Sequence, residues 1–310
     1  MCFDPGEFVA RAIKELQDAL PTGRAVVACS GGVDSTVCAI LAHRAFGSRA
    51  QAVFLDTGFM REGEAAAVQA ALESLGIPLE VVPAAPRFFQ NLAGISDPEE
   101  KRKAFRSTFY AVLATVVAEK QARALVQGTI AADVQETQAA VKTHHNVLDL
   151  APQIWPKGLL ILEPVRALLK PQVREVARFL GLGESFVQRR PFPGPGLAIR
   201  VVGEVTPHRV ELLRQAARIV EEETADLPAF QAFPVLLAER ATGVRQGARH
   251  YGEVLVLRIV VSADALSAEP FPLPWTRLQR LVHRLLQELP DLSRVVYDLT
   301  PKPPATIEWE

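Results

Sequence analysis

Short, mostly apolar runs recur at intervals through the first half of the chain. They lie at residues 25–29, 52–55, 79–82, 124–127 and 159–162. Runs of this length are typical of strands that are buried on both faces of a parallel sheet. Between and around them, apolar residues recur at helical spacing over residues 7–20, 33–46, 60–75, 97–121 and 168–180. Strands that alternate with helices predict an α/β fold with a doubly wound parallel sheet.

A second pattern begins after residues 191–196, a segment that contains three prolines and two glycines. Such a segment continues neither a helix nor a central strand. The residues beyond it predict strands at 197–202, 232–238, 253–261 and 294–299, with helices at 206–223 and 275–288. We therefore expect a parallel-sheet domain at residues 1–190 and a smaller α+β domain at residues 191–310.

Charge and cysteine content narrow the classes of partner. The chain has 34 basic and 35 acidic residues, so it lacks the basic excess typical of nucleic-acid binding. Its cysteines, Cys2, Cys29 and Cys38, form no C-x-x-C pair, which argues against a zinc site and favours a reducing, cytoplasmic setting. Neither a signal peptide nor a long apolar run is evident, so we expect no membrane association.

A glycine loop follows the first predicted strand and opens the next helix. It consists of Ser30, Gly31, Gly32, Val33, Asp34, Ser35 and Thr36. Glycines let the backbone approach a ligand closely, and the N-terminus of the following helix presents free N–H groups and the positive end of its dipole. Phosphate suits such a turn, although a simple strand–helix turn capped by Ser30 or Asp34 would show part of the same pattern.

The loop differs from a Walker A motif because it lacks the lysine and has an aspartate, Asp34, where phosphates are expected. A carboxylate at that position is compatible with phosphate oxygens only if a cation lies between them. We therefore expect Asp34 to bind Mg²⁺ that bridges to pyrophosphate oxygens.

The Ser-Gly-Gly-x-Asp-Ser pattern resembles the loop of the N-type ATP pyrophosphatase superfamily, whose members split ATP into AMP and pyrophosphate. Within this superfamily, other segments resemble GMP synthase. These are residues 97–99, 101–103, 127–130, 142–147, 191–197, 294–298 and 302–310, together with Asp133 and Glu136. The similarity covers the ATP pyrophosphatase and dimerization domains of that family, without its glutamine amidotransferase domain.

The resemblance implies that ATP adenylates xanthosine monophosphate (XMP) and that ammonia then displaces AMP to give GMP, with ATP and Mg²⁺ as cofactors. It implies that residues 30–36 and Asp56 bind ATP and that Lys170 acts near the phosphates. Residues 128–158 show no clear element, and by resemblance they form a lid. The catalytic residues implied there are Asp133, Glu136 and Lys142, and those implied for XMP binding are Arg102, Gln231, Lys302, Ile307 and Glu308.

The resemblance also implies a homodimer and a separate glutamine amidotransferase subunit that supplies ammonia, although free ammonia is an alternative source. Two other functions stay open. An RNA-modifying ATP pyrophosphatase would need a basic face and usually paired cysteines. A non-catalytic nucleotide-binding protein is suggested by departures from the family pattern at Ala131-Ala132, at Arg190 and at residues 243–249.

Overall fold

The computed structural model describes residues 3–131, 154–263 and 265–310. Asp133, Glu136 and Lys142 lie outside the described residues. The chain divides into two compact units. The first comprises residues 1–57, 63–84 and 107–189, and the second comprises residues 58–62, 85–106 and 190–310. The domain boundary after residue 190 stays a prediction.

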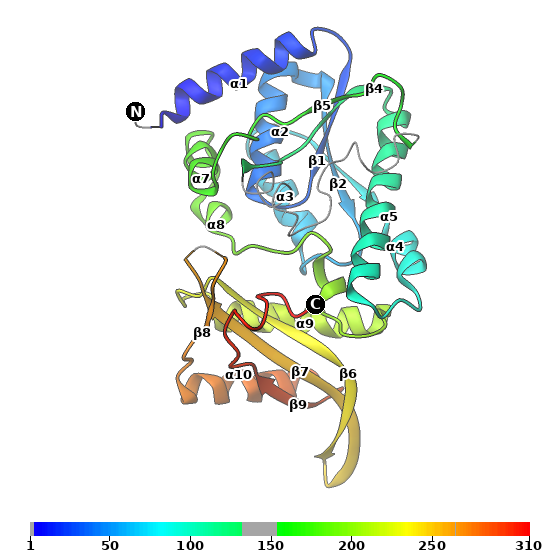
Figure 1. The fold of residues 1–310 in the computed structure, drawn as a ribbon, viewed down its shortest axis with the longest axis vertical. Helices are drawn as coiled ribbons and strands as arrows, with labels where there is room; N and C mark the ends of the chain where they lie inside the picture. The colour runs from blue at the N-terminus through cyan, green and yellow to red at the C-terminus, as the bar shows by residue number, and fades with distance from the viewer. Residues whose placement is uncertain (1–2, 132–153, 264) are drawn as a thin grey trace. The chain divides into compact units, whose positions relative to one another are not determined.

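The first unit is built on a five-stranded parallel sheet with the order β3-β2-β1-β4-β5 (Figure 1). Its strands are β1 (Arg24–Cys29), β2 (Ala50–Asp56), β3 (Leu79–Pro83), β4 (Ala122–Val126) and β5 (Leu160–Leu162). The chain passes from β1 to β2 and β3 on one side, and then returns to place β4 on the other side of β1. Ligands of open α/β sheets bind at the carboxyl ends of strands beside such a reversal, which here lies between β1 and β4.

Helices cover both faces of this sheet. In Figure 1, α1 (Pro5–Ala19), α2 (Val33–Phe46) and α7 (Lys170–Phe179) lie on one face, and α5 (Pro98–Glu119) lies on the other. The unit also contains η1 (Gly47–Arg49), α3 (Glu64–Glu73) and α8 (Glu184–Val187). Because α2 packs against the sheet, α1 and α7, it is buried along most of its length and is apolar on nearly all sides. The doubly wound parallel sheet predicted from the sequence is therefore confirmed.

The second unit contains a four-stranded mixed sheet. β7 (Ala248–Val261) pairs antiparallel with β6 (Gln231–Arg245) and β8 (Glu269–Pro270), and parallel with β9 (Leu292–Tyr297). α9 (Pro207–Glu223) packs on β6, and α10 (Trp275–Glu288) packs on α9 and β9. α4 (Ala85–Leu92), which the sequence pattern did not predict, also belongs to this unit. No helix in the described part of the chain is long and apolar enough to cross a membrane.

The β6–β7 hairpin is longer than the two predicted strands. It ends in a two-residue turn at Gln246 and Gly247, with φ angles of 50° and 77°. Positive φ at both residues is the conformation that a tight hairpin turn requires. The departure from the family pattern at residues 243–249 therefore falls on the tip of this hairpin.

The predicted strand at residues 197–202 is wrong. Gly196–Ile199 instead form a 3₁₀ turn, η4, and only Val201 makes an isolated bridge to β6. Gly196 has a φ of 62°, and a Cβ there would lie 2.2 Å from the Phe59 carbonyl oxygen. The Leu197 N–H donates to the same oxygen at 2.8 Å. The run is apolar because this turn is buried, and a short buried run has no periodicity that separates it from a strand.

Candidate active site

The glycine loop joins the carboxyl end of β1 to the first turn of α2. Ser35 Oγ accepts a hydrogen bond from the Ser30 N–H at 3.1 Å and donates to the Gly32 carbonyl at 3.0 Å. Thr36 Oγ1 donates to the same carbonyl at 3.0 Å. Gly32 is the N-cap residue and offers no side-chain acceptor to the helix. The free N–H groups of the first turn therefore suit an anion.

Asp34 lies in this first turn and faces Lys170, the first residue of α7. Lys170 Nζ donates to Asp34 Oδ2 at 2.6 Å, and the two side chains are 38% and 21% exposed, respectively. The other carboxylate oxygen, Oδ1, is buried and has no hydrogen-bond partner among the described residues. A buried oxygen without a donor is costly, and a hard cation such as Mg²⁺ would satisfy it.

An ion pair supports the loop beneath Gly31, which has a φ of 88°. A Cβ at Gly31 would lie 2.4 Å from Oε1 of Glu64, the first residue of α3. Glu64 is 3% exposed, and Arg189 NH1 donates to its Oε1 at 2.9 Å. The same nitrogen lies 3.5 Å from the Gly31 carbonyl oxygen. Neither charged residue could be predicted from the sequence, because no local pattern connects positions so far apart.

The carboxyl end of β4 also contacts the loop. A Cβ at Gly128 would lie 2.7 Å from the Ser35 backbone nitrogen and 2.9 Å from the Asp34 carbonyl carbon. Just before it, the Gln127 carbonyl accepts a hydrogen bond from Cys38 Sγ at 3.4 Å. Burial, together with the negative charge of Asp34, raises the pKa of Cys38 well above its usual value. Cys38 is therefore a neutral packing residue. The short distances at position 128 show that the chain after β4 can approach the loop this closely only with glycine there.

Asp56 ends β2 at the same edge of the sheet. In the β1–β2 register, Cys29 pairs with Phe54, so Asp56 lies two residues beyond the last paired position of β1. Its carbonyl accepts a hydrogen bond from the Ala84 N–H at 2.9 Å, and its side chain is half-buried. The position therefore adjoins the strand end from which the glycine loop departs.

The five residues implied for XMP binding all belong to the second unit. They are Arg102 in α5, Gln231 at the start of β6, and Lys302, Ile307 and Glu308 near the end of the sequence. Gln231 is 7% exposed, and within the described ranges its Oε1 has no hydrogen-bond partner. Lys302 Nζ donates to the Ala265 carbonyl at 2.9 Å.

The last six residues, 305–310, are here called the tail segment. Ile307 is buried in an apolar cluster with Phe233, Val235 and Val256. Both carboxylate oxygens of Glu308 accept hydrogen bonds from Arg200, each at 2.9 Å. A terminal segment of this kind would ordinarily fray, so these contacts are informative.

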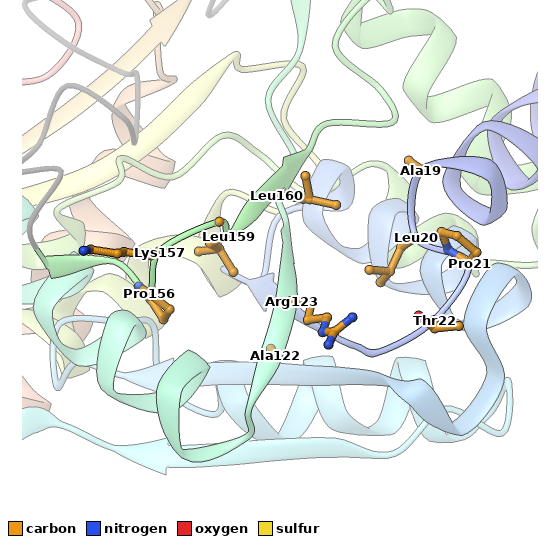
Figure 2. Close-up of a pocket in the computed structure, with 11 residues that line it drawn as sticks. Ala19, Leu20, Pro21, Thr22, Ala122, Arg123, Pro156, Lys157, Leu159 and Leu160 are labelled. Carbon is orange, nitrogen blue, oxygen red and sulfur yellow. The ribbon is translucent and has the colours of Figure 1, made fainter.

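A cavity of about 460 Å³ lies at the other edge of the sheet in the first unit (Figure 2). It is lined by residues just before β1, at the start of β4 and around the start of β5, including Leu20, Pro21, Arg123, Leu159 and Leu160. In Figure 2 the Arg123 side chain lies between the two leucines near β5 and the residues before β1. Because this is the amino edge of the strands, the cavity does not include the glycine loop.

A parallel sheet with a lysine-free Ser-Gly-Gly-x-Asp-Ser turn at its switch point defines an N-type ATP pyrophosphatase. Residues 8–194 match the family model for NAD synthase, and residues 218–309 match that for the GMP synthase C terminal domain. The structure of NMN synthetase from Francisella tularensis shares the fold, with a TM-score of 0.52 and 20% sequence identity. The similarity covers 68% of this chain and 85% of that one.

Relatives that match over the full length identify the family. The chain is 48% identical to a subunit of the glutamine-hydrolyzing GMP synthase of Methanopyrus kandleri, over 99% of this chain and 100% of the relative. It is 47% identical to the equivalent proteins of Archaeoglobus fulgidus and Thermococcus kodakarensis, over 99% and 98% of this chain and 100% and 99% of those relatives. The chain belongs to this family of GMP synthase subunits, which confirms the resemblance seen in the sequence.

Proposed function

We propose that this chain is the synthetase subunit of GMP synthase, which converts ATP, XMP and ammonia into AMP, pyrophosphate and GMP. The observation that carries the proposal is the Asp34 carboxylate. One of its oxygens faces Lys170, and the other is buried without a partner in the described part of the chain. Both features suit the pyrophosphate half of ATP. The names of the relatives support GMP as the product, and the resemblance seen in the sequence supports XMP as the acceptor.

The chemistry has two steps. The C2 oxygen of the XMP base attacks the α-phosphorus of ATP, forming an O–P bond while the bond to pyrophosphate breaks and the base loses a proton. Ammonia then adds at C2, AMP leaves with the original oxygen, and a second proton is lost. The first-turn N–H groups of α2 and the ammonium of Lys170 stabilise the negative charge that develops on pyrophosphate.

The residues present fit Mg²⁺. This ion keeps several waters and is usually bound through one or two carboxylates together with substrate phosphates, so Asp34 alone is an adequate protein ligand. The buried Oδ1 is the atom that we propose to contact it. When bound, Mg²⁺ neutralises charge on the phosphate oxygens.

For the acceptor, we propose that Arg102 and Lys302 bind the phosphate of XMP, and that Glu308 accepts a hydrogen bond from a ribose hydroxyl. Gln231 and the backbone of Ile307 complete this group. The lid role of Asp133, Glu136 and Lys142 is proposed on the family resemblance, as is the ATP contact of Asp56.

Ammonia needs a source. The relatives are named as one subunit of a glutamine-hydrolysing enzyme, and we propose that a separate glutamine amidotransferase subunit supplies ammonia to this chain. We also propose a homodimer formed through the second unit, in a reducing, cytoplasmic setting. Sedimentation of the purified chain tests the dimer, because a monomer at micromolar concentration would contradict it.

The function is tested by measuring pyrophosphate and GMP with ATP, Mg²⁺ and XMP, first with ammonium and then with glutamine. We expect turnover with ammonium and none with glutamine until the amidotransferase subunit is added. An Asp18→Asn variant provides a matched control for Asp34→Asn, because Asp18 is exposed on α1. Failure of the wild-type chain to release pyrophosphate in the presence of XMP and saturating ammonium would refute the proposal.

A further inference from the structure

The tail segment is acidic, although the proposed acceptor site must bind a phosphate. It brings the carboxylates of Glu308 and Glu310 to the unit that also contains Arg102 and Lys302. An unpaired carboxylate near a phosphate would weaken anion binding by like-charge repulsion. The cations that face these two acids therefore decide whether the tail segment is compatible with the site.

Each tail carboxylate has its own buried cation. Lys101 is 0% exposed, and its Nζ donates to Glu310 Oε2 at 2.6 Å and to the Val201 carbonyl at 2.6 Å. Burial lowers the pKa of Lys101, and the Glu310 carboxylate partly opposes that effect by stabilising the ammonium form. Arg102 donates a further hydrogen bond to the backbone oxygen of Glu310.

The second cation is equally enclosed. Arg200 is 3% exposed and binds both oxygens of Glu308. Its guanidinium carbon lies 3.9 Å from the ring centroid of Phe233 and 5.1 Å from that of Phe192. Two aromatic rings and a bidentate carboxylate fix the position of this side chain.

We propose that Lys101 and Arg200 are positioning residues of the acceptor site, which hold the tail segment in place and neutralise its two carboxylates. The inference rests on the proposed function, since it concerns the same XMP site. With both acids paired, Lys302 keeps its positive charge without a carboxylate partner among the described residues. Arg102 pairs with Glu99 at 2.5 Å and stays partly exposed. The lone pairs of Glu308 that Arg200 does not use are available for a hydroxyl of the ligand.

Lys101→Met tests the inference because methionine has a similar length and favours the helix, while it removes the charge. Lys103→Met is the matched control, because Lys103 lies on the same helix, is exposed and pairs with Glu100 at 2.7 Å. We expect Lys101→Met to raise the KM for XMP by about tenfold or more, with little change in the KM for ATP. Lys103→Met should change neither constant.

A spectroscopic signal reports the tail segment directly. The chain has three tryptophans, and replacing Trp155 and Trp275 with phenylalanine leaves Trp309, which is 39% exposed, between the two acids. Lys101→Met should shift the Trp309 emission to longer wavelength and increase its quenching by iodide. Glu310→Gln should produce the same change, and the double variant should add little to either single one, because both remove one interaction.

Equal XMP constants and equal Trp309 quenching in Lys101→Met and Lys103→Met would overturn the inference. So would a released tail segment with an unchanged KM for XMP. If the wild-type chain shows no XMP-dependent turnover, the proposed function fails. Calorimetric titration of XMP into the two variants then decides the positioning role by itself, since weaker binding to Lys101→Met alone supports it and equal binding overturns it.

Discussion

Replacing Asp34 with asparagine removes one negative charge from the glycine loop while it preserves the size of the side chain. The ion pair with Lys170 spans 2.6 Å, but the two side chains are 21% and 38% exposed. Water screens such a pair, so its loss lowers the free energy of unfolding by only about 1 kcal/mol. For a unit of this size that corresponds to a fall of about 2–4 °C in Tm.

The effect on catalysis should be much larger. A group that stabilises charge only in the transition state contributes about 3–4 kcal/mol, and losing it lowers kcat by about 100- to 1,000-fold. Asparagine still accepts a hydrogen bond from Lys170, but its neutral oxygen is a poor ligand for Mg²⁺. We therefore expect Asp34→Asn to lower the rate of pyrophosphate release by about 100- to 1,000-fold, with only a small loss of stability.

The assay is XMP-dependent pyrophosphate release at saturating ammonium, repeated over a series of Mg²⁺ concentrations, with thermal unfolding of the same samples. Asp18→Asn is the control and should match the wild type in both measurements, since Asp18 is exposed on α1. Activity within about twofold of the wild type at every Mg²⁺ concentration would refute the role given to Asp34. A fall in Tm large enough to unfold the protein at the assay temperature would refute the energetic reasoning.

Three further changes test other parts of the structure. Gly128→Ala places a Cβ 2.7 Å from the Ser35 backbone nitrogen, so we expect it to displace the loop and raise the KM for ATP. Burial raises the pKa of Cys29 from 9.0 to about 12. The native thiol therefore stays protonated at pH values at which the thiol of the unfolded chain ionises, so the free energy of unfolding should fall as pH rises from 9.0 to about 12. In urea titrations, Cys29→Ala should make this fall shallower. Arg190 donates to Thr224 Oγ1 at 2.9 Å just beyond α9, so Arg190→Gln should lower the free energy of unfolding by about 2 kcal/mol, measured by urea, without changing the KM for ATP.

The parallel sheet and the glycine loop could be predicted because their signals are local. Residues 24–29 and 33–46 form the strand and helix that the apolar pattern indicated, and residues 275–288 form the predicted helix. The predicted strand at 197–202 failed because a buried 3₁₀ turn and a buried strand have the same composition. Helix 85–92 could not be predicted because it is short, has a proline, Pro86, in its first turn, and begins with only one residue between it and the end of β3.

The supporting charges could not be predicted in this way. Lys101 lies in a basic cluster that is typical of an exposed helix face, and nothing near it in the sequence indicates that it is fully buried against Glu310. Glu64 and Arg189 are also far apart in the chain, and only the folded unit brings them together. In the sequence alone, the residues that support the predicted site therefore look like ordinary surface charges.

The contact between Gly31 and Glu64 has a consequence for sequence divergence and for engineering. Because Gly31 has a φ of 88° and the Glu64 side chain fills the space that a Cβ there would need, position 31 is restricted to glycine twice over, and a change at Glu64 alone would remove only one of the two restrictions. Related sequences should accordingly keep glycine at this position even where the glutamate differs. A loop transplanted into another protein of this class would have its backbone turn but not its support, unless the glutamate and its arginine were transplanted with it.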